Sequence, residues 1–296
     1  MIDLSTIDPA KPVLIAGPTA SGKSGLALRI AQAQGGVVIN ADALQVYANW
    51  RILTARPAPE EEALAPHKLY GHIPGDQAYS VGDWLREVTE LLQQDIRPII
   101  VGGTGLYFKA LTVGLADIPQ TPDHIRETAM RRIAEEGSDA LLAELDDATR
   151  SKIDAQNPMR VQRAWEVLQA TGTPLVEWQK NTKPPLLPLA ETTALCLDAP
   201  KEWLTPRIEQ RFDLMLEQGA LEEARANAPT FSRDLPSAKT IGAAEVIAYV
   251  NGEISLEDAR EASIIQTRQY AKRQRTWFRA NMGDWRHISA TRKEAA

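Results

Sequence analysis

Residues 17–24 read GPTASGKS and fit the pattern G-x-x-x-x-G-K-[ST] in full. They follow the apolar run PVLIA at 12–16 and open a segment, 22–33, whose apolar residues recur at helical spacing. Glycines let successive backbone N–H groups turn toward one anion, and the N-terminus of a helix adds its dipole. The pattern therefore predicts a phosphate-binding loop between a strand and a helix.

We assign the phosphate-binding role to all eight residues of this loop. They are Gly17, Pro18, Thr19, Ala20, Ser21, Gly22, Lys23 and Ser24. Lys23 supplies a positive charge for phosphate, and the hydroxyl of Ser24 is suited to Mg²⁺, the cofactor that we expect. The alternative is a tight glycine-rich turn that binds nothing, and the loop alone does not say which polyphosphate it holds.

The apolar runs VVIN at 37–40 and IIV at 99–101 alternate with helical segments, among them residues 79–94. Continuous apolar runs are typical of parallel strands covered on both faces. We therefore expect an α/β fold, a P-loop parallel sheet flanked by helices.

This pattern changes between residues 118 and 189, where no strand-like run occurs and the sequence is charged and helical. Prolines stand at both ends of the segment, and TTALCL at 192–197 resembles a strand again. We predict a first core part at 1–117, an all-helical insertion at 118–190, and a second core part at 191–296. The last part should contain helices at 201–218, 238–250 and 255–279.

Composition excludes several classes of protein. Of 296 residues, 44% are apolar and 24% charged, as in soluble globular proteins, and one cysteine excludes a disulfide framework. No apolar run approaches the length of a membrane span, and residues 1–11 do not resemble a signal peptide, so we expect a cytoplasmic protein. The net charge of -6 argues against a simple nucleic-acid coat, although an average can hide a basic face.

Two polar residues follow predicted strands. Asp42 ends the second strand, whereas the third is followed by Gly102, Gly103 and Thr104, where nucleotide hydrolases usually carry an Asp for magnesium. Ligands bind at the carboxyl ends of parallel strands, so Asp42, Thr104 and the phosphate loop should share one cleft. This set suits group transfer from a diphosphate better than ATP hydrolysis. The alternatives are turn or capping roles, and for Asp198, after a later strand, we expect a solvated turn.

Together these residues resemble the tRNA dimethylallyltransferase (tRNA isopentenyltransferase) family over almost the whole chain. The motifs are GPTASGKS (17–24), NADALQVY (40–47), TARP (54–57), AYSVGDW (78–84), PIIVGGTGLYFKAL (98–111), RVQRAWEVLQATGTPL (160–175), RFDLMLEQGALEEA (211–224) and TRQYAKRQRTWFR (267–279). The combination is far more specific than the phosphate loop alone.

The resemblance implies transfer of a dimethylallyl group from dimethylallyl diphosphate to N6 of the adenine beside the tRNA anticodon, position 37. It implies a P-loop core with a helical insertion that grips the anticodon arm, and we expect a monomer. Asp42 would accept or orient the N6 proton, and Thr104 would contact the diphosphate side of the reacting centre. Ser21, Lys23 and Ser24 would hold the diphosphate with Mg²⁺.

The resemblance also implies a set of tRNA contacts. They are Asp42, Ala43, Leu44, Gln45, Thr104, Arg126, Met159, Arg160, Val161, Gln162 and Arg163. Four positions depart from the family pattern: Ala43 replaces the common Ser, Lys68 stands in a usual His-His pair, and Ala243 and Ala244 replace a Tyr-Lys pair. The change at Ala243 and Ala244 removes an aromatic and a basic side chain from a turn expected to face RNA, so it bears on the tRNA contacts there and leaves the chemistry unchanged.

A basic stripe lies near the C-terminal end. Arg268, Lys272, Arg275 and Arg279 are spaced four, three and four residues apart, and residues 268–279 contain five basic residues and no acid. On a helix the four share one face. We expect phosphate contacts from Arg268 and Lys272, either to RNA or to the diphosphate, and the alternative is a solvated charged face.

Two other functions share the phosphate loop, a small-metabolite kinase and an RNA-binding NTPase without transfer chemistry. The kinase should carry an arginine-bearing lid, and the NTPase an Asp after the third strand. The motif VGGTGLY, which has no acid, and the basic helix favour prenyl transfer. Trp84, Trp165, Trp203 and Trp277 are expected in the core, and the four histidines at the surface or hydrogen-bonded.

Overall fold

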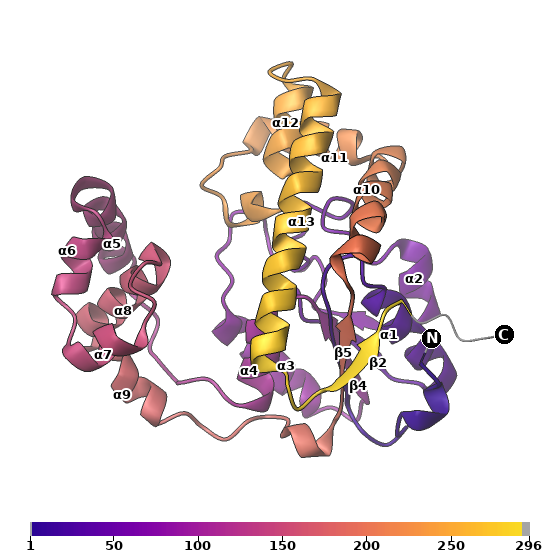
Figure 1. The fold of residues 1–296 in the computed structure, drawn as a ribbon, viewed down its shortest axis with the longest axis horizontal. Helices are drawn as coiled ribbons and strands as arrows, with labels where there is room; N and C mark the ends of the chain where they lie inside the picture. The colour runs from indigo at the N-terminus through magenta and orange to yellow at the C-terminus, as the bar shows by residue number, and fades with distance from the viewer. Residues whose placement is uncertain (1, 292–296) are drawn as a thin grey trace. The chain divides into compact units, whose positions relative to one another are not determined.

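The computed structural model describes residues 2–291, which form two compact units (Figure 1). One unit combines residues 1–112 with 187–296 and contains the sheet, and the other is Val113–Leu186. The predicted helical insertion at 118–190 overlaps this second unit. Each unit has its own core, so each is described by itself.

The first unit is built on one sheet with the strand order β3-β2-β4-β1-β5-β6, in which every pairing is parallel. The strands are β1 (Val13–Ala16), β2 (Val37–Asn40), β3 (His67–Lys68), β4 (Pro98–Gly102), β5 (Thr193–Asp198) and β6 (Arg286–Ser289). The fold-class prediction is confirmed. The sequence did not predict β3 and β6, because HK and RHIS are short polar segments without an apolar run.

Helices cover both faces of the sheet because the strands are apolar on both sides. Val13 and Ile15 of β1 pack with α1 (Lys23–Gln34), whereas Leu14 and Ala16 belong to a cluster on the other face. That second cluster includes residues of α3 (Val81–Leu92), α4 (Gly105–Thr112) and α13 (Leu256–Asn281).

The remaining helices of this unit include α2, which packs against α1, and a group of helices next to α13. They are α2 (Pro59–Leu64), α10 (Lys201–Glu217), α11 (Ala220–Asn227) and α12 (Ala243–Val250), with short 3₁₀ turns at Leu4–Thr6, Leu189–Glu191, Ala228–Thr230 and Pro236–Lys239. Helices α10 to α13 share a core with Phe212, Val246 and Ile264. The helix predicted at 238–250 begins only at Ala243, because Gly242 adopts a left-handed backbone with φ of 87°.

The second unit is helical. It contains α5 (Asp123–Glu136), α6 (Ser138–Ala143), α7 (Asp147–Lys152), α8 (Pro158–Thr171) and α9 (Leu175–Lys180) around a small apolar core. Trp165 is buried in this core and donates a hydrogen bond to Glu144 at 2.6 Å. Trp84 is likewise fully buried in the first unit, and Trp203 and Trp277 are half-buried. No helix within residues 2–291 combines the length and apolarity needed to cross a bilayer.

The ends of β2 and β4 lie very close together. The Ala41 N–H donates to Val101 O at 2.8 Å, and Ala41 O accepts from the Thr104 N–H at 3.1 Å. A Cβ atom at Gly102 would lie 2.0 Å from Ala41 O, so only glycine allows this approach. The loops after both strands are therefore fixed to each other by backbone atoms.

We predict that Gly102→Ala destabilises the protein by about 1–3 kcal/mol, because backbone must move to admit the methyl group. Gly25→Ala in α1 is the matched control. A Cβ there meets nothing within 4 Å, and removing a helical glycine is neutral or stabilising by about 1 kcal/mol. Thermal unfolding of both variants measures the difference, and an unchanged Tm for Gly102→Ala would contradict this account of the strand ends.

Candidate active site

The phosphate loop connects β1 to α1 as expected from its sequence. Ala20 and Gly22 have positive φ values of 60° and 86°, which turns the chain around the loop. The Ser21 side chain is 4% exposed, and its hydroxyl has no hydrogen-bond partner among residues 2–291. A buried hydroxyl without a partner is costly, and a ligand oxygen in the loop would satisfy it. The loop is thus suited to an anion.

Lys23 carries the main charge of this loop. Its side chain is half-buried, with Nζ 3.4 Å from Pro18 O. Burial lowers the pKa of Lys23 to about 8, the charge of Asp42 acts in the opposite direction, and Arg211 lowers the pKa further. Lys23 is therefore still mainly protonated at neutral pH, and an added anion would raise its pKa.

Arg211 is a second cation in the same pockets, and no role was predicted for it from the sequence. It lies on α10, and burial lowers its pKa while the charge of Asp42 opposes this. Its neighbour Arg207 donates to Ala20 O at 3.1 Å, which attaches α10 to the phosphate loop. Arg211 is the first residue of the motif RFDLMLEQG, which was recognised in the sequence. No sequence pattern indicated that α10 contacts the phosphate loop, so the importance of this arginine could not be predicted.

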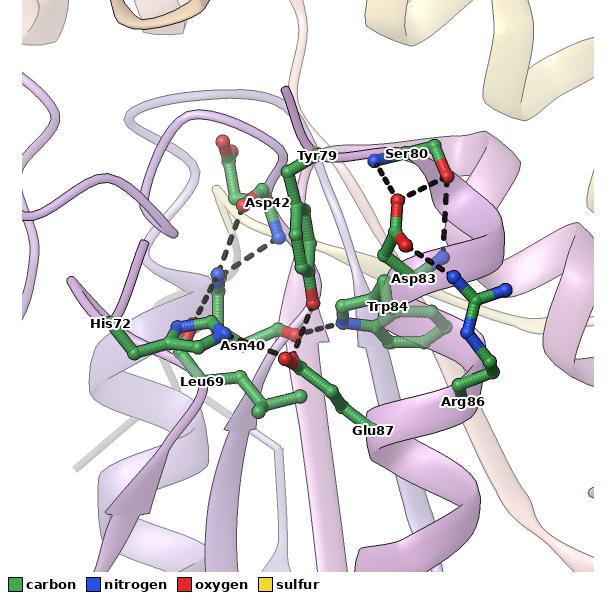
Figure 2. A network of polar contacts seen from close by, with 10 residues as sticks. All are labelled: Asn40, Asp42, Leu69, His72, Tyr79, Ser80, Asp83, Trp84, Arg86 and Glu87. Carbon is green, nitrogen blue, oxygen red and sulfur yellow. Dashed lines mark hydrogen bonds and ion pairs between the residues drawn. The ribbon is translucent and has the colours of Figure 1, made fainter. Parts of the chain in front are cut away.

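Asp42 is held by the buried side chain of Asn40, the last residue of β2 (Figure 2). Asn40 Oδ1 accepts from the Asp42 N–H at 2.8 Å, and Nδ2 donates to Asp42 O and Leu69 O at 2.9 and 3.0 Å. Asp42 Oδ1 accepts from the Leu44 N–H at 3.0 Å. Its Oδ2 makes no hydrogen bond to any described residue, so one carboxylate oxygen can accept a proton.

The contacts in Figure 2 connect this turn to α3. Trp84 Nε1 donates to Asn40 O at 2.7 Å. Tyr79 donates to Glu87 Oε2 at 2.6 Å, and Nε2 of His72 lies 2.8 Å from the same oxygen. Ser80 and Asp83 cap the helix reciprocally, and Asp83 pairs with Arg86. The turn of Asp42 is thus attached to α3 through Asn40 and Trp84.

Thr104 joins the two loops as well. Its Oγ1 accepts a hydrogen bond from the Ala43 N–H at 3.0 Å, so Ala43 contributes through its backbone where a serine was expected. The Thr104 hydroxyl also interacts with the side chain of Tyr270 on α13. Gln45 supports the turn from the other side, since its amide donates to Thr54 O and Ala55 O at 2.8 and 2.9 Å.

Gln274 of α13 bridges the phosphate loop and the end of β4. Its Oε1 accepts from the Thr19 N–H at 2.9 Å, and its Nε2 donates to Gly103 O at 3.0 Å. The side chain is 5% exposed. Tyr270 lies one turn earlier, and burial and the charge of Asp42 raise its pKa. Only the basic face of this helix was predicted from the sequence to have a function, so both residues were missed.

These groups line two adjoining pockets in the first unit. One contains Thr19, Asp42, Leu44, Gln45 and Tyr270, together with Lys23 and Arg211. The other contains the phosphate-loop residues Ala20, Gly22 and Ser24, again with Lys23 and Arg211. Both cations thus line the pocket of the phosphate-binding loop and the pocket of Asp42. Such an arrangement can hold an anionic leaving group on one side and a nucleophile on the other.

The other predicted RNA contacts belong to the second unit. Met159 and Arg160 are exposed at the start of α8, and Arg163 donates to Thr121 Oγ1 at 2.6 Å. Gln162 donates to Glu166 at 2.8 Å, and Arg126 is half-buried.

Val161 differs from these neighbours, because it is fully buried in the core of the second unit. The predicted contact between its side chain and RNA is therefore corrected: the helical spacing of α8 directs this position inward.

Asp198 was expected in a solvated turn, but it is the last residue of β5 and has a side-chain partner. The pairing of β5 with β6 places His287 beside it, with Nδ1 at 3.0 Å from Asp198 Oδ2. Cys196 lies next to them, and burial raises its pKa to about 12, so the thiol is protonated at neutral pH. Cys196, Asp198 and His287 come together because β6, which was not predicted from the sequence, pairs with β5.

Family models and individual relatives agree on the relationship of this chain. The model described as IPP transferase matches residues 45–281, and the one described as isopentenyl transferase matches residues 11–70. A tRNA dimethylallyltransferase of Dinoroseobacter shibae is 59% identical over 285 residues, which cover 96% of this chain and 96% of that protein. One from Cereibacter sphaeroides (strain ATCC 17025) is 58% identical, with coverage of 95% and 97%.

Solved structures give the same result. The full-length tRNA isopentenylpyrophosphate transferase from Bacillus halodurans is 31% identical, covers 95% of this chain and 90% of its own, and has a TM-score of 0.65. A eukaryotic dimethylallyltransferase acting on tRNA is 29% identical, with coverage of 95% and 74% and a TM-score of 0.79. The resemblance seen in the sequence is confirmed, and the chain belongs to the IPP transferase family.

Proposed function

We propose that this protein transfers the dimethylallyl group of dimethylallyl diphosphate to N6 of adenine 37 in tRNA and forms N6-isopentenyladenosine. One observation carries the proposal: Lys23 and Arg211 line both the phosphate-loop pocket and the pocket of Asp42. The relatives named tRNA dimethylallyltransferase, of which the one from Dinoroseobacter shibae is 59% identical, support tRNA as the acceptor.

The donor's diphosphate would bind to the phosphate loop. The loop offers backbone N–H groups, the buried Ser21 hydroxyl, and the charges of Lys23 and Arg211. Ser24 is exposed in the first turn of α1, so its hydroxyl would be able to hold a Mg²⁺ ion bound together with the donor. When bound, the metal would neutralise charge on the departing diphosphate.

The acceptor nitrogen N6 is a weak nucleophile, because its lone pair is delocalised into the adenine ring. The bond from N6 to C1 of the allyl group forms as the bond from C1 to the diphosphate oxygen breaks, and that oxygen keeps the electron pair. Asp42 Oδ2 takes the N6 proton, while Lys23 and Arg211 stabilise the growing charge on the diphosphate. Holding both reactants in line supplies much of the acceleration, and the base must leave its stack to reach the pocket.

The direct test is incubation with Mg²⁺, unmodified tRNA and either labelled dimethylallyl diphosphate or labelled ATP. We expect label from the first donor in N6-isopentenyladenosine after digestion of the tRNA, and no steady-state ATP hydrolysis. If tRNA stimulates ATP hydrolysis and no prenylated adenosine forms, the proposal is wrong and the protein is an NTPase.

Asp42→Asn should lower kcat by about 10²–10⁴, the range for loss of a general base, with little change in either KM. The asparagine Oδ1 can still accept from the Leu44 N–H, so the turn is preserved while the charge is lost. Steady-state kinetics measures both parameters. A kcat within a few-fold of the wild type would show that Asp42 serves only to form the turn.

Donor affinity should depend on the protonation of Lys23. Because the pKa of Lys23 is about 8 in the free protein, the affinity for dimethylallyl diphosphate should be full below that pH and fall above it, by up to about tenfold per pH unit. Calorimetry without tRNA measures binding alone. Lys23→Met should bind weakly and without this inflection, and an identical inflection in Lys23→Met would assign it to another group.

Gln274→Ala should lower kcat and raise the KM for the donor together, because the phosphate loop and the end of β4 lose their common brace. Each lost hydrogen bond is worth about 1 kcal/mol, and the backbone groups left unpaired add to the cost. Gln269→Ala is the matched control, since Gln269 is an exposed glutamine of the same helix. Equal kinetics for the two variants would refute a positioning role for Gln274.

A further inference from the structure

Three side chains of metal-ligating types meet where β5 pairs with β6. Cys196 is in register with His287, and Asp198 lies two residues after Cys196 on the same strand. Residues in register and residues two apart share one face of a sheet, so the three side chains project from the same face. One ligand atom of each residue lies within 4.8 Å of those of the other two. The sheet thus joins residues that are 89 positions apart in the sequence.

The ring of His287 is oriented by the end of α13. Its Nε2 lies 2.9 Å from Met282 O, and a carbonyl oxygen only accepts, so Nε2 carries a hydrogen. In the neutral ring Nδ1 then has a lone pair, which faces the two carboxylate oxygens of Asp198 at 3.1 and 3.0 Å. Two acceptors at this distance repel each other unless a cation lies between them. An N–H donated to a backbone carbonyl is also the usual outer contact of a histidine that ligates a metal.

The cation between these groups can be a proton or a metal ion, and Cys196 favours the metal. A proton on Nδ1 satisfies only His287 and Asp198. The Cys196 thiol is free and fully buried, and no residue from 2 to 291 makes a hydrogen bond with it. A divalent ion uses all three groups, and the charges of one thiolate and one carboxylate balance it. Neutrality matters here, because Cys196 lies in an apolar cluster with Phe278 and Met282 where a net charge is costly.

We propose that Cys196, Asp198 and His287 form a Zn²⁺ site. Sulfur, imidazole and carboxylate ligands together suit Zn²⁺, whereas Mg²⁺ and Ca²⁺ prefer oxygen ligands. Tetrahedral ligands about 2.0–2.3 Å from Zn²⁺ lie about 3.3–3.8 Å from one another. Small rotations reach this spacing, and the Asp198 side chain is 60% exposed and therefore able to turn. On binding, the Cys196 sulfur exchanges its proton for the metal, and the proton passes to solvent.

An adjoining pocket gives access to this site. Asp198 and His287 line the pocket, which has a volume of about 380 Å³ and reaches Pro18 of the phosphate loop. It offers a path for the ion and space for a water as the fourth ligand. The metal attaches β6 to β5 and, through the His287 ring, to the end of α13. Its role is structural, because it stabilises the folded arrangement of these three elements.

The test uses the full chain, freed of metal with a chelator, and zinc chloride as the probe. Affinity is measured by competition with a chromophoric chelator, and Tm is measured with and without Zn²⁺. The variants are Cys196→Ser, Asp198→Asn and His287→Gln. The last two change exposed side chains, so they remain informative if the buried Cys196→Ser fails to fold. The matched controls are His124→Gln and Asp284→Asn, which remove an exposed histidine and an exposed aspartate outside the cluster.

We expect the wild type to bind a single Zn²⁺ per chain, and its Tm to rise by about 5 °C once Zn²⁺ exceeds its Kd about 100-fold. Each cluster variant should weaken binding by about 100-fold or more and lose the rise in Tm, whereas both controls keep them. With Co²⁺ as the probe, a thiolate-to-metal charge-transfer band should appear in the wild type and be absent from Cys196→Ser.

Two results would overturn the proposal. One is a wild type that binds no Zn²⁺, and the other is Zn²⁺ binding by the cluster variants that equals that of the controls. In either case Asp198 and His287 form an ion pair with a proton on Nδ1. These measurements need neither tRNA nor dimethylallyl diphosphate, so their outcome is independent of the proposed function.

Discussion

The catalytic arrangement depends on one buried amide. Gln274 accepts a hydrogen bond from Thr19 in the phosphate loop and donates one to Gly103 after β4. These two loops leave neighbouring parallel strands, and the sheet alone fixes only where they begin. The amide fixes how far apart they remain, because it can satisfy a donor and an acceptor simultaneously. The end of β2 is tied in turn to β4 through Ala41 and Thr104. Residues from three distant segments thereby occupy defined positions around one cleft.

Positive side chains outnumber negative ones in this cleft. Two cations, Lys23 and Arg211, face a single carboxylate, that of Asp42. Burial lowers the pKa of Lys23 to about 8, so this cation is protonated at neutral pH but loses its proton at mildly alkaline pH. A diphosphate restores the balance, and its departure as a more highly charged group is favoured by the same cations. Binding of the donor and activation of its leaving group thus have one electrostatic origin.

The sequence predicted the parts of the fold that local patterns encode. The phosphate loop, the strands β1, β2 and β4, and the convergence of Asp42 with Thr104 follow from apolar runs and turn residues that need no distant information. The polar strand β6 could not be found this way, because only its pairing with β5 makes RHIS extended. Arg211 was missed for a related reason, since its importance comes from the crossing of α10 over the phosphate loop. Val161 was expected to contact tRNA because it lies in a family motif, although its helical phase buries its side chain.

The brace between the phosphate loop and α13 also sets the order in which a functional molecule can be made. Thr19 leaves the ribosome early, whereas Gln274 follows 255 residues later. Gly105 is likewise shaped for a late partner, since a Cβ there would lie 2.1 Å from the ring of Trp277. During synthesis the nascent chain can form β1, α1 and their loop, but the loop lacks its support until nearly the last helix has emerged. The phosphate loop is therefore completed only by the C-terminal helix, and a nascent chain that stops short of α13 would carry the phosphate-binding motif without the geometry that makes it useful.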